Sequence, residues 1–164
     1  MNITILNLYY PPDTGATAKI LRDVAKVLAK RHSVTVIAGR PSYDPSELHP
    51  YYLSRTDTDG DTVIKRVGST AFHRKRMVGR SINFLSYMIL AFVKAMTIKP
   101  KPDLIIAMTD PPVISLVGAL IGLIRGCPWI YNIRDLHPDM ARASGIVKNG
   151  FFVSVWDRIH RWAM

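Results

Sequence analysis

Several features that define common protein classes are rare or missing in this sequence. It has a single cysteine, Cys127, which excludes an intrachain disulfide and a metal site built from cysteines alone. It has a single glutamate, Glu47. Its first residues lack the basic and then apolar pattern of a signal peptide. We therefore expect Cys127 to be an unreactive thiol in a reducing compartment. We also expect the protein to lie in the cytoplasm.

Familiar motifs for nucleotide binding and catalysis are also missing. The chain has no G-x-G-x-x-G dinucleotide fingerprint and no phosphate-binding loop ending in Gly-Lys-Ser/Thr. It has no Gly-x-Ser-x-Gly, and its five histidines do not have the spacing of metal ligands. These absences disfavour a Rossmann oxidoreductase and a covalent nucleophile. They lead us to expect no metal ion and no cofactor.

Acidic residues are few: the chain has 12 Asp and Glu residues and 22 Lys and Arg residues, which gives a formal charge of +10. Such an excess favours an anionic partner, either a nucleotide, a nucleic acid or an anionic membrane surface. The basic residues are spread along the chain and no nucleic-acid motif accompanies them, so nucleic acid is not expected. A stand-alone basic module that binds membrane or nucleic acid without catalysis stays open as the alternative to an enzyme.

Long apolar runs are missing too. Residues 82–93 form the longest candidate, which is too short for a spanning helix. A helix buried on a sheet is one interpretation. An interfacial helix is the other, because basic residues precede it and could meet an anionic membrane surface, namely Arg74, Lys75, Arg76 and Arg80.

What the sequence does contain is a regular alternation of strand and helix patterns. Short apolar runs predict strands at 2–8, 33–39, 63–68, 103–108 and 129–133. Apolar residues at helical spacing predict helices at 18–32, 81–98 and 113–125, and an amphipathic segment at 151–164. Residues 40–62 are predicted to be a long loop and 69–80 a basic connector. The fold class is α/β, a single domain over 1–164 with a Rossmann-like, doubly wound, mostly parallel sheet and helices on both faces.

Three loops follow predicted strands, at 11–16, 109–112 and 134–139, and the carboxyl ends of parallel strands share one edge where ligands bind. In the first loop Gly15 would let the backbone approach a ligand, next to helical amides that favour an anion. Asp13 or Thr14 could instead cap the helix. Candidate substrate-binding residues around this edge are Asp13, Thr14, Gly15, Lys19, Asp110 and His137.

The third loop reads RDLHPD and holds the candidate catalytic pair. Arg134 could grip a phosphate or carboxylate, and Asp135 could orient a sugar hydroxyl or accept its proton. Equally open is a structural role, in which Asp135 or Asp139 caps the next helix and Arg134 forms an ion pair.

The combination of NLYYPPDTGATAKILRDVAKVLAKRHSVTVIAG, PDLIIAMTDPP and IYNIRDLHPDMARASG, in this order, resembles the N-terminal domain of glycosyltransferase family 4. Within that family it is similar to the bacterial branch that builds cell-surface polysaccharides. The resemblance covers essentially the whole chain and implies a GT-B architecture. It further implies a retaining transfer from a nucleotide-diphosphate sugar, without a metal, to an acceptor held by this domain.

In that branch the acceptors are typically polyprenyl-diphosphate-linked saccharides at the inner face of the cytoplasmic membrane, which would explain a basic surface. The resemblance places Gly15 near the donor phosphates, and Arg134 and Asp135 near the reacting sugar. Many relatives have a histidine where this chain has Arg134. The resemblance implies a second domain with two glutamates separated by seven intervening residues, a pair that a chain with only Glu47 lacks. We therefore expect the donor-binding domain to be missing and the chain to be inactive alone.

Overall fold

A computed structural model describes residues 1–42, 51–72, 77–134 and 158. Within these residues the strands are β1 (Asn2–Leu6), β2 (Ser33–Ala38), β3 (Ser54–Asp59), β4 (Thr62–Val67), β5 (Leu104–Ala107) and β6 (Trp129–Tyr131). The helices are α1 (Ala16–Ala29), α2 (Met77–Thr97) and α3 (Ile114–Arg125).

The described strands form one sheet in the order β3-β4-β2-β1-β5-β6, and every pair is parallel except β3 with β4. The chain leaves β1 for β2 and β4 on one side and later returns to β5 and β6 on the other. This is the doubly wound arrangement, and it confirms the predicted fold class. Its point of reversal lies between β1 and β5, which pair in register from Ile3 with Leu104 to Leu6 with Ala107.

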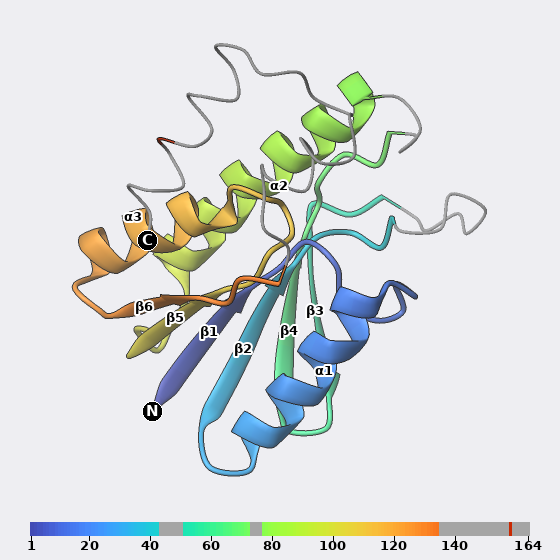
Figure 1. Cartoon of the computed structure of the whole chain (residues 1–164). Helices are drawn as coiled ribbons and strands as arrows, with labels where there is room; N and C mark the ends of the chain where they lie inside the picture. Colours follow the sequence, from blue (N-terminus) through green and yellow to red (C-terminus); the bar gives the residue numbers. More distant parts are fainter. Residues whose placement is uncertain (43–50, 73–76, 135–157, 159–164) are drawn as a thin grey trace.

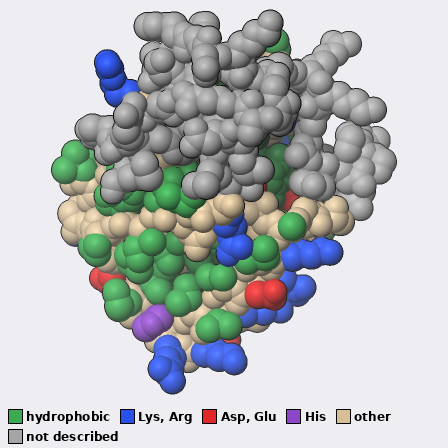
Figure 2. Space-filling view, viewed as in Figure 1, with side chains coloured by type: hydrophobic (Ala, Val, Ile, Leu, Met, Phe, Trp, Pro, Cys, Tyr) green, Lys and Arg blue, Asp and Glu red, His purple; other side chains and the backbone are tan. Residues whose placement is uncertain are grey.

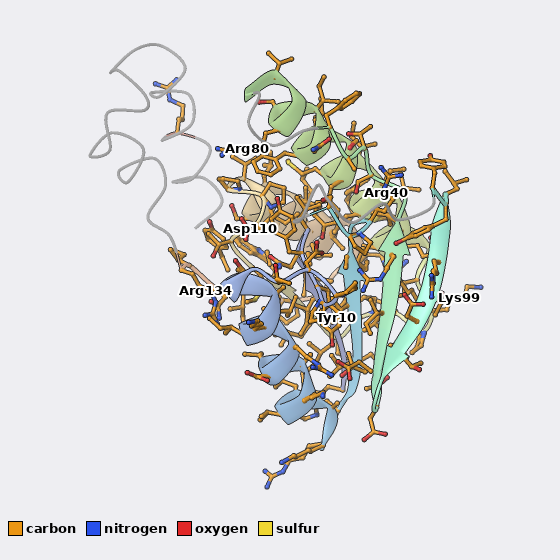
Figure 3. All side chains as sticks on the ribbon, turned by 90° about the vertical axis from the view of Figure 1, so that its right-hand side faces the viewer. Tyr10, Arg40, Arg80, Lys99, Asp110 and Arg134 are labelled. Atoms are coloured by element: carbon orange, nitrogen blue, oxygen red, sulfur yellow. The ribbon has the colours of Figure 1, made fainter. Side chains whose placement is uncertain are left out.

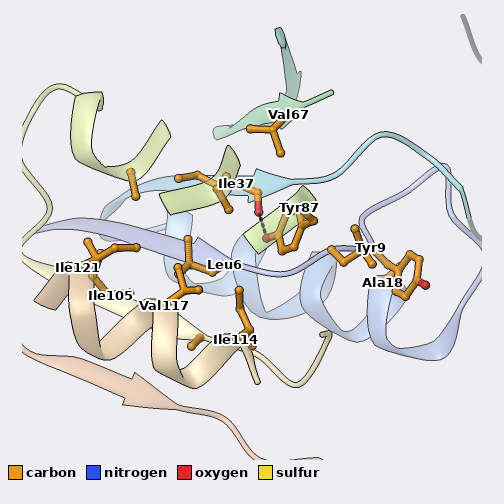
Figure 4. Close-up of a cluster of buried hydrophobic side chains, with 14 residues drawn as sticks. Leu6, Tyr9, Ala18, Ile37, Val67, Tyr87, Ile105, Ile114, Val117 and Ile121 are labelled. Carbon is orange, nitrogen blue, oxygen red and sulfur yellow. Dashed lines mark hydrogen bonds between the residues drawn. The ribbon is translucent and has the colours of Figure 1, made fainter. Parts of the chain in front are cut away.

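Helices cover both faces of the sheet (Figure 1), as predicted. On one face α2 and α3 pack over a core that includes Leu6, Ile37, Ile105 and Ile121, all fully buried. Tyr87 of α2 enters this core, and its hydroxyl donates a hydrogen bond of 2.8 Å to the carbonyl oxygen of Ile37 (Figure 4). Burial raises the pKa of the Tyr87 phenol well above its ordinary value, so this donor stays protonated.

On the other face α1 lies against β2 and β4. Its buried residues Leu21 and Ala25 meet Val34, Val36 and Ile64 of the sheet. α1 covers β6, at the far edge of the sheet, less than it covers β2 and β4, and Ile130 of β6 is 51% exposed. Figure 2 shows hydrophobic side chains gathered on this side of the molecule, beside the basic residues that line α1.

The predicted loop at 40–62 was wrong in part, because residues 54–59 form β3. This strand reads Ser-Arg-Thr-Asp-Thr-Asp and lies at the sheet edge, mostly exposed, so it lacks the apolar alternation that marks a half-buried strand. A usable signal was present in Asp59-Gly60, a typical hairpin turn. Gly60 adopts a φ of 61°, which glycine reaches without strain.

The helices differ from the predictions mainly at their ends. α2 begins at Met77, so the end of the predicted basic connector belongs to the helix. α1 is shifted to Ala16–Ala29. α3 ends at Gly126, whose left-handed conformation lets its N–H bond the carbonyl of Gly122. The predicted helix after Arg134 and the amphipathic segment 151–164 lie outside the described residues, apart from Arg158.

Candidate binding edge of the sheet

The carboxyl ends of β1 and β5 lie side by side at the point where the strand order reverses. The chain after β1 runs to α1 on one face of the sheet, and the chain after β5 runs to α3 on the other (Figure 1). In doubly wound sheets the separation of these two connections opens the crevice where ligands bind. The first two candidate loops therefore meet at this edge, as predicted.

Asn7 joins these two loops. It is fully buried, and its side-chain amide donates to the carbonyl oxygen of Tyr9 at 2.7 Å while its side-chain oxygen accepts from the Asp110 N–H at 3.3 Å. The Leu8 N–H adds a bond of 2.8 Å to the carbonyl oxygen of Asp110. Sequence reasoning missed Asn7, although an amide directly after an apolar strand is a weak sign of such a bridge.

The third loop is attached through Thr109. Its hydroxyl donates to the carbonyl oxygen of Asn132 at 3.1 Å and accepts from the Arg134 N–H at 3.0 Å. This bond fixes the backbone of Arg134 at the same end of the sheet as Asp110, and the side chain of Arg134 is exposed there (Figure 3). The structure thus brings the start of all three predicted loops together, and Arg134 and Asp110 lie at their junction.

Asp13 is bound within the fold. It is 6% exposed, and its carboxylate accepts from the Ser42 N–H at 2.9 Å and the Tyr10 N–H at 3.3 Å. It connects the first loop to the chain after β2. The predicted alternative that Asp13 or Thr14 caps α1 was wrong, because the N-cap residue is Gly15 and no side chain bonds there.

Gly15 is buried and has φ −59° and ψ 148°, a conformation open to any residue. Its backbone therefore does not require glycine. Its carbonyl oxygen accepts from the N–H groups of Ala18 and Lys19 at 3.1 and 3.2 Å. The side chain of Lys19 is exposed in the first turn of α1, where amides without a side-chain cap favour an anion.

Arg66 is the main residue of this edge that sequence reasoning missed. It is 4% exposed at the end of β4. Its guanidinium donates to the carbonyl oxygen of Pro11, to that of Gly39 at 3.3 Å and to the carboxylate of Asp57 at 3.0 Å. The first loop is thus connected to the end of β2 and to the middle of β3 by one cation. A lone arginine in a short strand gives little warning of this in sequence.

A second charged cluster contacts Tyr10, the residue directly before the first loop. The carboxylate of Asp59 accepts from Arg22 Nε at 2.6 Å and from the Tyr10 hydroxyl at 3.1 Å, and Lys26 Nζ lies 3.3 Å away. The hydrogen bond from Arg22, with smaller contributions from Lys26 and Tyr10, holds the pKa of Asp59 at about 2, although partial burial opposes this shift. Burial, together with the Asp59 charge, raises the pKa of Tyr10.

This cluster makes stability depend on pH. The pKa of Asp59 is lower in the folded chain than its ordinary 3.8, so the cluster stabilises the fold above about pH 4, and this contribution is lost as the pH falls toward 2. Arg22 is exposed to water, which screens the ion pair and keeps the effect small. Asp59→Asn should therefore lower the urea midpoint at neutral pH, with the difference from wild type vanishing in acid. A difference that persists unchanged at low pH would contradict this.

The remaining predicted residues lie outside the described part of the chain, namely Asp135, His137, Arg74, Lys75 and Arg76. Arg80 is described, and its guanidinium carbon lies 5.6 Å from the centre of the Phe84 ring. Among residues 1–42, 51–72, 77–134 and 158, no three His, Cys, Asp or Glu side chains are grouped closely enough to hold a metal ion.

No protein-family model matches the sequence, and no curated protein matches it. The structure resembles a solved sucrose-phosphate synthase from Thermosynechococcus elongatus, with a TM-score of 0.57 and 10% sequence identity, over 99% of this chain and 40% of that one. That protein is a GT-B glycosyltransferase. The chain shares its fold with part of that protein.

The shared feature is the Rossmann-like sheet, whose strand order reverses between β1 and β5. The chain spans about two-fifths of the length of the protein that it matches. The predicted membership of family 4, and of its polysaccharide branch, rests on the sequence motifs.

Proposed function

We propose that this chain is the acceptor-binding domain of a retaining glycosyltransferase of family 4. The enzyme would move a sugar from a nucleotide-diphosphate donor to a lipid-linked saccharide in polysaccharide biosynthesis. The observation that carries the proposal is the hydrogen-bonded junction of three loops at the reversal point of the sheet, where Asn7 and Thr109 position Asp110 and Arg134. Doubly wound sheets bind their ligands at such an edge.

The residues at this edge suit a sugar and a phosphate. Arg134 offers an exposed guanidinium to a phosphate oxygen, and the first-turn amides of α1 with Lys19 offer a second anion-binding element. The carboxylate of Asp110, at the same junction, is of the type that accepts hydrogen bonds from sugar hydroxyls. Asp135, next to Arg134, is proposed to act on the reacting sugar.

The donor-binding domain is proposed to be a separate part of the complete enzyme. We expect the chain to bind ligands at its edge but not to transfer sugar by itself, because the paired glutamates of the family are not in it. The acceptor is proposed to be presented at the inner face of the cytoplasmic membrane, where a chain of charge +10 is attracted to anionic lipid.

Ligand titration by NMR tests the binding edge. Adding UDP or GDP, and separately a soluble prenyl diphosphate, should shift the amide resonances of Gly15, Lys19 and Arg134. Arg134→Ala should weaken this binding by roughly tenfold, which corresponds to about 1.4 kcal/mol for a charge-assisted contact.

Arg31→Ala serves as the matched control. Arg31 is also an exposed arginine, between α1 and β2 at the opposite edge of the sheet, so its loss removes the same charge without touching the junction. Equal weakening by both variants would show that charge alone attracts the ligand and would contradict the proposed site. Tighter binding of single-stranded DNA than of any diphosphate would favour the non-catalytic alternative.

Gly15→Val tests the role of the first loop. The backbone of Gly15 has a conformation that valine adopts, so we expect a loss of stability of about 1 kcal/mol, typical of a poorer N-cap. A β-branched side chain beside the first-turn amides should hinder the approach of a phosphate and weaken UDP binding by roughly tenfold or more. Urea unfolding and calorimetric titration measure the two effects. Losses of equal size in both would contradict a binding role.

A further inference from the structure

Helix α2 is apolar on two opposite sides. Its inner side carries Tyr87, Ala91 and Ala95, which are fully buried in the core. Its outer side carries five large aliphatic residues that are between 42% and 73% exposed, namely Val78, Ile82, Leu85, Ile89 and Val93. The helix of a water-soluble domain normally has polar residues on this outer side. Here its outer surface is as apolar as its core.

The five aliphatic residues, called the outer stripe below, form one continuous line. They recur at intervals of four, three, four and four residues, which at 100° per residue keeps them within one face of the helix, opposite Tyr87. Single exposed aliphatic residues are ordinary, but a line of five along 21 helical residues marks an interaction surface.

The charges of α2 narrow the choice of partner. The helix contains two charged residues, Arg80 and Lys94, both cations, and no acidic residue. Lys99 and Lys101 follow its end. None of the described helices is long and apolar enough to cross a membrane. An apolar stripe on a helix that carries cations and no anions fits the boundary of an anionic lipid bilayer, with the helix in the plane of the membrane.

The stripe begins at the candidate binding edge. α2 follows β4, so its first turns lie at the carboxyl end of the sheet (Figure 1). Buried Asn83 fixes the connection there, since its side-chain oxygen accepts from the Phe72 N–H at 2.8 Å and from the Thr70 hydroxyl at 2.9 Å. Its amide donates back to the carbonyl oxygen of Phe72 at 2.8 Å. The start of the helix is therefore attached to the chain that follows β4.

We infer that the outer stripe of α2 is a lipid-contacting surface that docks the protein on an anionic membrane beside its binding edge. The purpose of this docking rests on the proposed function, because a saccharide attached to a membrane lipid would then need to rise only a short distance to reach the edge. The contact itself does not depend on any glycosyl transfer. Its aliphatic residues insert among the lipids, and the exposed cation Arg80 stays at the headgroups, whereas the ammonium of Lys94 donates to the Ser54 hydroxyl of β3 at 3.0 Å.

Vesicle flotation of the 164-residue chain tests the contact. We expect binding to vesicles that contain phosphatidylglycerol, weaker binding to pure phosphatidylcholine, and partial release in high salt, which screens the cations but not the apolar insertion. Leu85→Asp should reduce the partition coefficient by roughly tenfold or more, because it places a charge in the apolar boundary. Circular dichroism confirms that the variant is folded.

Val27→Asp is the matched control. Val27 is 65% exposed on α1, and Leu85 is 59% exposed on α2, so the two changes are alike, but α1 covers the opposite face of the sheet. The control should float like the wild type. Equal losses for the two variants would show that overall charge, rather than the outer stripe, decides binding, and would overturn the inference.

A fluorescent label locates the contact directly. In a Cys127→Ser background, Leu85→Cys carrying an environment-sensitive dye should shift its emission to the blue on anionic vesicles, while Val27→Cys should not. Binding without a shift at position 85 would overturn the inference. The inference would also be overturned if the chain did not bind vesicles and instead formed a dimer in sedimentation experiments that Leu85→Asp dissociates. Vesicle binding that persists while nucleotide binding fails would contradict the proposed function alone.

Discussion

Arg66→Met should destabilise the fold by about 3–5 kcal/mol, because it removes one partner of a buried charge network. Methionine has a similar length but no donor, so the carbonyl oxygen of Gly39 loses a buried hydrogen bond, that of Pro11 loses a partly buried one, and Asp57 loses a cation. The first loop should also lose its attachment to β4. We therefore expect a lower urea midpoint, and faster hydrogen exchange in residues 10–15 than elsewhere.

Arg55→Met is the control for this variant. Arg55 pairs with the same carboxylate, Asp57, at 2.7 Å, but its side chain is 60% exposed where that of Arg66 is 5% exposed. An exposed ion pair contributes about 0.5 kcal/mol, so this change should hardly alter the free energy of unfolding. If both variants lost the same stability, the Asp57 charge rather than the burial of Arg66 would be the cause.

Asn7→Leu should cost about 2–4 kcal/mol and also weaken ligand binding at the edge. Leucine fills a similar volume but removes the buried bond to the carbonyl oxygen of Tyr9 and the partly buried bond from the N–H of Asp110. Because the same side chain joins two of the loops, the Asp110 and Arg134 amides should change their resonances and UDP should bind at least several-fold more weakly. Urea unfolding and NMR titration measure the two effects.

Asn2→Ala is the corresponding control at the other end of β1. The Asn2 side chain donates to the Asp103 carboxylate at 3.3 Å, again linking β1 to the chain at β5, but at an exposed site and at the edge away from the loops. Water replaces such a bond at little cost, so we expect a loss of about 0.5 kcal/mol and unchanged ligand binding. Weaker ligand binding by Asn2→Ala would contradict a special role for the carboxyl edge.

The sequence predicted most elements because their apolar residues recur with a clear period. The alternation of strands and helices was sufficient to predict a doubly wound sheet, and the strand-then-loop pattern was sufficient to predict that three loops share an edge. β3 was not predicted because this exposed edge strand has no apolar alternation, and only the Asp59-Gly60 turn indicated a hairpin there. The extra turn at the start of α2 was not predicted because its basic and small residues resemble those of a connecting segment.

The motifs of the candidate site were visible in sequence, whereas the side chains that position them were not. Arg134 and Asp110 stand in recognisable loops. Asn7 and Arg66 gain their roles from partners far along the chain, such as Asp110 for Asn7 and Pro11 for Arg66. A hydrogen bond between distant residues leaves no periodic trace in a single sequence.

The sequence by itself determined the fold class, because the burial of apolar residues at periods of two and of about 3.6 admits few arrangements. It also determined the excess of positive charge and the identity of the loop motifs. Tertiary structure decided which face of α2 is covered and which is left open. Both faces of that helix are apolar in sequence, and only its packing against β2, β4 and α3 shows that Tyr87 is inside and Leu85 is outside.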